Sequence, residues 1–212
     1  MDLFEKIKEE AKKMLEGINS CHEWEHTERV YNLAMKMGRK ENVDLEVLGI
    51  SAILHDIARK EQDELSGKIC HAERGAILAK QILEKHRFQK EKIENIAHCI
   101  ETHRYRNDKK PETKEAKILY DADKLDAIGA IGIGRAFSFA GHIGAKIHNK
   151  DINLTKTKAY STDDSAYREY MVKLRHIKDK MLTVEGKRIA EERHNFMEHF
   201  FKRLDKEVDG EV

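Results

Sequence analysis

The sequence predicts an all-α protein. Its apolar residues recur three and four positions apart, which is the period of one helix face. Lys and Glu dominate the composition, and charged residues make up 37% of the chain, against roughly 25% in ordinary soluble domains. The single proline, Pro111, leaves long stretches compatible with helix. A chain of 212 residues can bury one substantial core, so we expect a single domain over residues 1–212.

Five helices are expected before Pro111. The first ends at Gly17, and the second starts at Ser20, which stands in capping-box spacing with Glu23. The third contains an apolar run and is followed by a polar loop over 60–67. These helices span about residues 2–15, 20–37, 44–59, 71–85 and 90–103.

Three further helices are expected over about 116–139, 163–181 and 185–203, because apolar residues recur there at helical spacing. The polar segments 104–113 and 141–162 read as loops. We place the ligand-bearing core at about 18–139, and a C-terminal helical pair at about 163–207 extends the same domain.

The charge balance excludes several functional classes. There are 40 basic and 39 acidic residues, a net charge of +1, so broad binding of nucleic acid or membrane is not expected. No apolar run approaches the ~20 residues of a membrane span, and the N-terminus lacks the apolar stretch of a signal peptide. Cys21, Cys70 and Cys99 are too scattered for a disulfide framework. The sequence therefore predicts a soluble cytoplasmic protein.

Four residues from three helical segments form a candidate metal site. His55 and Asp56 close the apolar run 47–54, His26 lies upstream, and Asp123 lies downstream. Two imidazoles and two carboxylates make a mixed nitrogen and oxygen set that suits a divalent transition metal. A lone helical histidine is usually structural, and a His-Asp pair is short enough to arise by chance. The order along the chain nevertheless favours the metal interpretation.

A zinc-protease interpretation competes for part of this set. His22-Glu23-x-x-His26 fits the H-E-x-x-H signature, in which both histidines bind zinc and the glutamate activates water. That signature belongs within a helix, whereas here it falls in the first turns, where Glu23 is expected to serve the helix cap. We therefore rank this interpretation low.

With these motifs in place, the chain resembles the HD-domain superfamily of metal-dependent phosphohydrolases. Within it, the chain is most similar to bacterial nucleotide pyrophosphohydrolases of the YpgQ or YedJ type. The resemblance is carried by residues 26–30, 54–58 and 121–137, and more weakly by 181–193. It covers nearly the whole chain, and it implies an all-α HD domain.

The resemblance also implies a ligand set of His, His-Asp and a distant Asp, here His26, His55, Asp56 and Asp123. Of the three carboxylates in 121–126, Asp123 and Asp126 can share a helix face, whereas Asp121 is two residues off it. The family's last Asp precedes a basic residue and Leu, which selects Asp123. Asp126 is then a candidate for proton transfer, and Asp121 for orienting a ligand imidazole.

The chain departs from the family pattern directly after the His-Asp pair. Many relatives place an acidic residue three or four positions later, where it helps to activate water. Arg59 and Lys60 occupy those positions here, so the resemblance supplies no general base there. Two cations beside a metal would attract an anionic phosphate, or they would only favour a helix C-terminus. Both interpretations stay open.

Other residues near the motifs are candidates for catalysis or substrate binding. His71, His98 and His103 form a second histidine group. Some relatives bind a second metal through histidines at comparable positions, where His71 fits best, and in one-metal relatives the same positions could contact phosphate or relay protons. The catalytic candidates are Asp126, Lys124 and His71. The substrate-binding candidates are Arg29, Arg59, Lys60, His98, His103 and Arg135.

Two further patterns are interpreted as structural. Gly129, Gly132 and Gly134 lack the spacing of a dinucleotide-binding loop, so close helix packing is expected there. The stripe of Tyr167, Tyr170, Leu174 and Ile177 in the tail is interpreted as core or as a homodimer surface.

The expected function is hydrolysis of a phosphate ester or phosphoanhydride of a small molecule, most readily a nucleotide. The expected cofactor is one divalent ion of Mn, Fe, Co, Ni or Zn, with a second ion left open. A non-catalytic nucleotide sensor is the main alternative, supported by the missing acidic residue after His-Asp. An oxygenase on a two-metal HD scaffold is a third.

Overall fold

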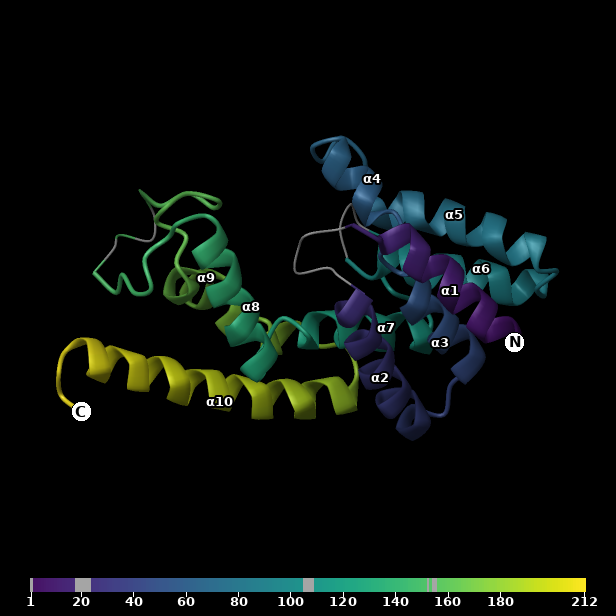
Figure 1. The fold of residues 1–212 in the computed structure, drawn as a ribbon. Helices are drawn as coiled ribbons and strands as arrows, with labels where there is room; N and C mark the ends of the chain where they lie inside the picture. Colours follow the sequence, from purple (N-terminus) through teal and green to yellow (C-terminus); the bar gives the residue numbers. More distant parts are fainter. Residues whose placement is uncertain (1, 18–23, 105–108, 152, 154–155) are drawn as a thin grey trace. The chain divides into compact units, whose positions relative to one another are not determined.

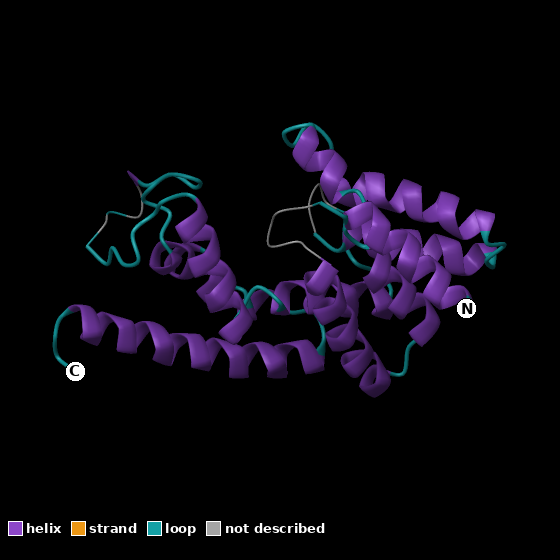
Figure 2. Ribbon diagram, viewed as in Figure 1, coloured by secondary structure: helices purple, strands orange, loops and turns teal. Residues whose placement is uncertain are grey.

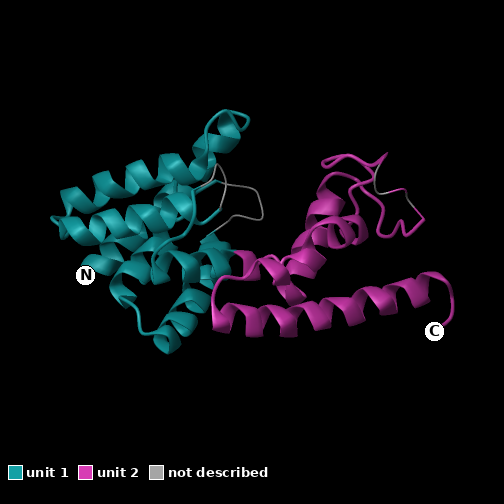
Figure 3. Cartoon of the chain, turned by 180° about the vertical axis from the view of Figure 1, so that it is seen from behind, with its two compact units in different colours: residues 1–123 teal, residues 124–212 magenta. Residues whose placement is uncertain are grey.

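The computed structural model describes residues 2–17, 24–104, 109–151, 153 and 156–212. The all-α prediction is confirmed, since these residues form helices and loops and contain no strand (Figure 2). They fall into two compact units, Met1–Asp123 and Lys124–Val212 (Figure 3). The single domain expected from the sequence stays a prediction.

Seven helices begin in the described part of the first unit. They are α1 (Leu3–Leu15), α2 (Trp24–Glu41), α3 (Leu45–Leu54), α4 (Arg59–Glu64), α5 (His71–Lys85), α6 (Lys90–Thr102) and α7 (Lys114–Leu125), the last of which crosses the unit boundary. Helix α3 packs against α1, α2 and α6, and α6 pairs with α5 (Figure 1).

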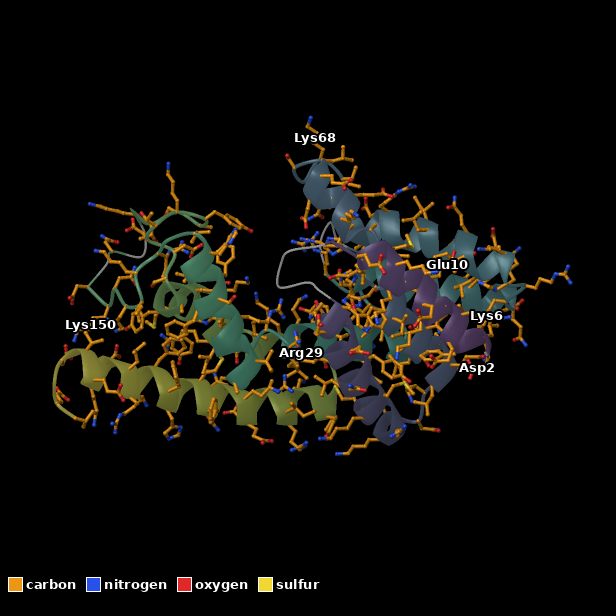
Figure 4. The ribbon with its side chains drawn as sticks, in the orientation of Figure 1. Asp2, Lys6, Glu10, Arg29, Lys68 and Lys150 are labelled. Atoms are coloured by element: carbon orange, nitrogen blue, oxygen red, sulfur yellow. The ribbon has the colours of Figure 1, made fainter. Side chains whose placement is uncertain are left out.

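Helix α3 lies at the centre of this unit because it is apolar on every side. Each residue from Val47 to Leu54 is buried, as expected of a helix without a polar face. Its N-terminus is capped by Asp44, whose carboxylate accepts hydrogen bonds from the backbone N–H groups of Glu46 and Val47. The outer helix α1 is amphipathic instead, and Asp2, Lys6 and Glu10 lie one turn apart along it (Figure 4).

The second unit contains three α-helices and two 3₁₀ turns among its described residues. They are α8 (Gly129–His142), α9 (Ala166–Val172), η2 (Leu174–His176), η3 (Lys178–Lys180) and α10 (Val184–Val208). Helix α8 packs against α9 and α10. The rings of Tyr170 and Phe201 stack with their centroids 4.2 Å apart, so this stripe belongs to the core of the unit. The homodimer stays a prediction.

Three expected helices differ from the observed ones. The helix predicted over 116–139 is broken before Gly129, which has a φ of +77° that favours glycine. The helix predicted over 163–181 is interrupted after Val172 and continues as the two 3₁₀ turns. The third helix ends at Leu54 instead of 59, and part of the loop predicted over 60–67 is helix α4. The expected cap at Ser20 and Glu23 lies outside the described residues.

The early end of α3 has a local cause. The backbone N–H of Ile57 donates to the Leu54 carbonyl at 3.4 Å, and that of Arg59 donates to the Asp56 carbonyl at 2.8 Å. Both bonds span three residues, so the chain tightens into a turn between α3 and α4. Within the described ranges, no helix is both long and apolar enough to cross a membrane.

Two glycines of α8 give a matched test of this packing. A Cβ on Gly132 would lie well inside the contact distance of the Ala127 carbonyl, whereas a Cβ on Gly134 would meet nothing within 4 Å. Gly132→Ala is therefore expected to lower the free energy of unfolding by about 1–3 kcal/mol. Gly134→Ala is expected to raise it by about 0.5–1 kcal/mol, because alanine favours helix over glycine. Urea unfolding of both variants checks this, and equal effects would contradict it.

Candidate metal centre

Six side chains of the first unit lie close together, each at or next to an end of one of its helices. His26 lies in α2, His55 and Asp56 lie in the turn after α3, and His71 is the first residue of α5. His103 follows the last residue of α6, and Asp123 lies in α7. All are buried except Asp123, whose side chain is 16% exposed. They form two groups of three, each able to hold a metal ion.

The first group contains His26, His55 and Asp123. The Nε2 atoms of His26 and His55 are 3.3 Å apart, and His26 Nε2 lies 3.5 Å from Asp123 Oδ1. Asp56 Oδ2 lies 3.8 Å from His26 Nε2 and 3.7 Å from His55 Nε2. The four residues predicted from the sequence to bind metal are therefore together.

The second group contains Asp56, His71 and His103. The Nε2 atoms of the two histidines are 3.3 Å apart, and they lie 3.1 and 3.6 Å from Asp56 Oδ1. One oxygen of Asp56 thus faces the first group and the other faces the second. This carboxylate joins the two groups.

His55 and His103 are oriented by the same device. Each directly follows the last residue of a helix, where backbone carbonyls have no partner within the helix. His55 Nδ1 donates to the Ala52 carbonyl at 2.8 Å, and His103 Nδ1 donates to the Ile100 carbonyl at 2.6 Å. In both cases the acceptor lies three residues earlier. The Nε2 atom of each ring is consequently left as the atom that faces the centre.

The protonation of these rings suits metal binding. Burial lowers the pKa of His55 to about 4, and burial likewise lowers the pKa of His71 to about 4. Both rings are therefore neutral at neutral pH. His71 Nδ1 donates to the side-chain oxygen of Gln62 at 2.9 Å, so its Nε2 carries a lone pair. A histidine that binds metal needs a neutral ring, in which one nitrogen binds the ion and the other donates its N–H to an acceptor.

The donor set fits a divalent transition metal. In their neutral forms, His71 and His103 both donate through Nδ1, so the Nε2 lone pairs face each other across 3.3 Å. Such lone pairs repel, and a cation between them and the Asp56 carboxylate would relieve that repulsion. Imidazole nitrogen with carboxylate oxygen suits Mn, Fe, Co, Ni or Zn.

The sequence grouped His103 with His71 and His98 and made it a substrate-binding candidate, and the structure places it beside His71. An available signal was its position at the end of α6, where it repeats the position of His55 at the end of α3. Gln62 and Arg104 received no role from the sequence. The side-chain oxygen of Gln62 accepts from the backbone N–H and Nδ1 of His71, and Arg104 also donates to it at 3.3 Å.

Three other candidates of the first unit, Arg59, Lys60 and His98, have partners outside the six-residue cluster. Arg59 donates to Asp63 at 3.2 Å on the exposed side of α4, and Lys60 donates to the Glu16 carbonyl at 3.1 Å. His98 Nε2 accepts the backbone N–H of Glu112 at 3.0 Å. Arg29 projects from α2 (Figure 4). Their roles in binding substrate stay predictions.

Arg59 begins α4 and does not close the helix before it. The interpretation of Arg59 and Lys60 as residues that favour a helix C-terminus therefore does not hold. The phosphate-attracting interpretation stays a prediction.

Three candidates belong to the second unit. Arg135 donates to Asp126 Oδ2 at 2.7 Å and to the Asp126 carbonyl at 3.3 Å. Asp126 is buried. Lys124 is the first residue of this unit. The catalytic roles of Asp126 and Lys124, and the contact of Arg135 with phosphate, stay predictions. His22 and Glu23 of the protease signature lie outside the described residues.

The sequence comparison defines the class of protein to which this site belongs. Residues 24–128 match the HD domain, and that range contains all six converging side chains. The chain is also 34% identical over 213 residues to the protein YpgQ of Bacillus subtilis, covering 97% of this chain and 94% of that protein. The chain belongs to the HD-domain family.

Solved structures agree with this assignment. The structure of Bacillus subtilis YpgQ in complex with ADP superposes with a TM-score of 0.75 at 31% identity, covering 96% of this chain and 94% of that one. An HD-superfamily hydrolase from Bacillus thuringiensis superposes with a TM-score of 0.77 at 29% identity, covering 97% of this chain and 96% of that one.

Proposed function

We propose that this protein is a metal-dependent phosphohydrolase that cleaves a phosphate ester or phosphoanhydride of a small molecule, most readily a nucleotide. The observation that carries the proposal is the position of Asp56, whose two oxygens face two separate groups of imidazoles at 3.1–3.8 Å. A buried carboxylate shared in this way is suited to hold cations that in turn hold phosphate.

His26, His55, Asp56 and Asp123 would hold one divalent ion, and Asp56, His71 and His103 would hold a second. Such an ion lowers the pKa of a bound water and withdraws charge from a phosphate oxygen. The side chains themselves supply orientation: the helix-end carbonyls fix His55 and His103, and Gln62 fixes His71. Burial keeps bulk water from competing for these donors.

The substrate class is inferred from charge and from a relative. Arg59, Lys60 and Arg104 lie in the segments directly after Asp56 and His103, so they offer positive charge for an anionic substrate. The YpgQ structure contains ADP, which supports a nucleotide. A small-molecule phosphate is accordingly the proposed partner, without nucleic acid or membrane.

The sensor alternative rests on one feature, the cations that replace an acidic residue after His-Asp. A sensor would bind nucleotide in the presence of metal without cleaving it. We favour the hydrolase because a sensor has no need for two groups of ligands around one shared carboxylate.

A substrate screen tests the proposal. Metal-stripped protein is reloaded separately with each of Mn, Fe, Co, Ni and Zn and incubated with nucleoside mono-, di- and triphosphates and with simple phosphate esters. We expect hydrolysis of at least one nucleotide with at least one metal, measured as product by ion-exchange chromatography, and none after stripping.

The other outcomes distinguish the alternatives. A nucleotide that raises the melting temperature with metal present but stays intact over hours would favour the sensor. Oxygen consumption without phosphate release would favour the oxygenase, and turnover of a peptide would favour the zinc protease.

A further inference from the structure

Gln62 lies where three hydrogen-bond donors meet. Its side-chain oxygen accepts from the backbone N–H of His71 at 3.1 Å, from His71 Nδ1 at 2.9 Å and from Arg104 at 3.3 Å. Three donors on one oxygen also settle which end of the amide faces them, because the amide nitrogen could accept none of them.

This contact distinguishes His71 from His55 and His103. Those two rings are fixed by backbone carbonyls at helix ends, which no substitution can remove directly. His71 instead opens helix α5, where backbone groups are donors and no carbonyl is available to its Nδ1. A side chain has to provide the acceptor, and the half-buried Gln62 of α4 does so.

Gln62 also links His71 to Arg104. The Arg104 guanidinium contacts the Gln62 oxygen at 3.3 Å and the Cys70 sulfur at 3.9 Å. Arg104 directly follows His103, and Cys70 directly precedes His71. The cation is therefore held close to His71, through the same Gln62 oxygen that binds its Nδ1.

We propose that Gln62 is a positioning residue that aims His71 at the second ion and holds Arg104 beside it to receive a substrate phosphate. The proposal rests on the proposed function, since it assumes that Asp56, His71 and His103 bind metal. Its consequence is selective, because among the described residues the side-chain oxygen of Gln62 accepts from His71 and Arg104, so the first group should be unaffected.

Manganese titration of the stripped full-length protein tests this without relying on activity. Calorimetry gives the affinity of each equivalent of Mn²⁺, and electron paramagnetic resonance reports whether two ions are coupled. Gln62→Ala is expected to lower the affinity for the second Mn²⁺ about 10- to 100-fold, which is the usual effect of removing a hydrogen-bond partner of a ligand histidine. The first equivalent should be unchanged, which also reports that the variant is folded.

Two variants sharpen the test. Gln62→Glu keeps an acceptor oxygen for both His71 and Arg104. Its affinity for the second Mn²⁺ should therefore be within a few-fold of that of the original protein. Gln81→Ala, on the exposed side of α5, is the matched control and should change neither equivalent. Arg104→Ala should raise the KM for the substrate found in the screen far more than it lowers kcat.

The possible failures are distinguishable. Gln62→Ala with two unchanged equivalents would overturn the positioning role and leave the hydrolase proposal intact. One equivalent in the original protein would also overturn it, because no second ion would exist for Gln62 to affect. Failure to bind any equivalent would overturn the proposed function itself.

Discussion

Asp56→Asn is expected to abolish detectable phosphate hydrolysis and to lower the affinity for both metal ions. Each Asp56 oxygen faces a different group of imidazoles, at 3.7–3.8 Å on one side and 3.1–3.6 Å on the other. Loss of an outer partner already costs about 10- to 100-fold in metal affinity, so loss of a shared ligand should cost more than 100-fold at both positions. Initial rates and metal titration of the reloaded variant measure this.

Two comparisons make the Asp56 result specific. Asp179→Asn changes an exposed carboxylate on η3 and should leave both rate and metal content unchanged. His71→Asn should lose only the second equivalent, because His71 faces one side of Asp56. Full activity in Asp56→Asn would show that this carboxylate is not part of the site.

The metal-stripped protein is expected to lose stability steeply as the pH falls below about 6.5. Burial lowers the pKa of His55 and of His71 from 6.5 to about 4. Between these values the unfolded chain binds protons that the folded protein does not, so stability increases with pH. Above pH 6.5 both rings are neutral in the folded and the unfolded chain, so the free energy of unfolding is at its full value with respect to them. It decreases as the pH falls from 6.5 towards 4.

Each of the two imidazoles contributes up to ~1.4 kcal/mol per pH unit within that range. Asp56 opposes the shift in both rings, and His103 adds to it. Urea midpoints of stripped protein at pH 7, 6 and 5 measure the slope, and His71→Asn should remove about half of it. Equal midpoints at pH 7 and 5 would contradict buried, neutral imidazoles.

The sequence was sufficient for the parts of the fold and site that follow local rules. The apolar run ending in His55 and Asp56 predicts a buried helix that delivers both residues to one place, and α3 does so. The position of His71 at a helix start was also anticipated. These inferences work because helix periodicity and helix ends are encoded within a few residues.

The remaining features depend on contacts between segments far apart in the chain. His98 and His103 belong to the same helical segment, and only the folded chain shows that His98 accepts a backbone N–H from the distant Glu112 whereas His103 reaches His71. The role of Gln62 is invisible without knowing that α4 lies beside the start of α5. The break before Gly129 was missed because the apolar pattern continues through it, and only the positive φ reveals the turn.

The carbonyls that fix His55 and His103 belong to the ends of two helices that pack on each other. The orientation of both rings is therefore fixed by the polypeptide before any ion binds. Such pre-organisation means that loading requires little rearrangement, so the entropy lost on capture is small. An inserted residue near the end of α3 would turn its ring away by about 100°, the rotation per residue of a helix. Length variation near these two ends should consequently be far less tolerated than in the loops.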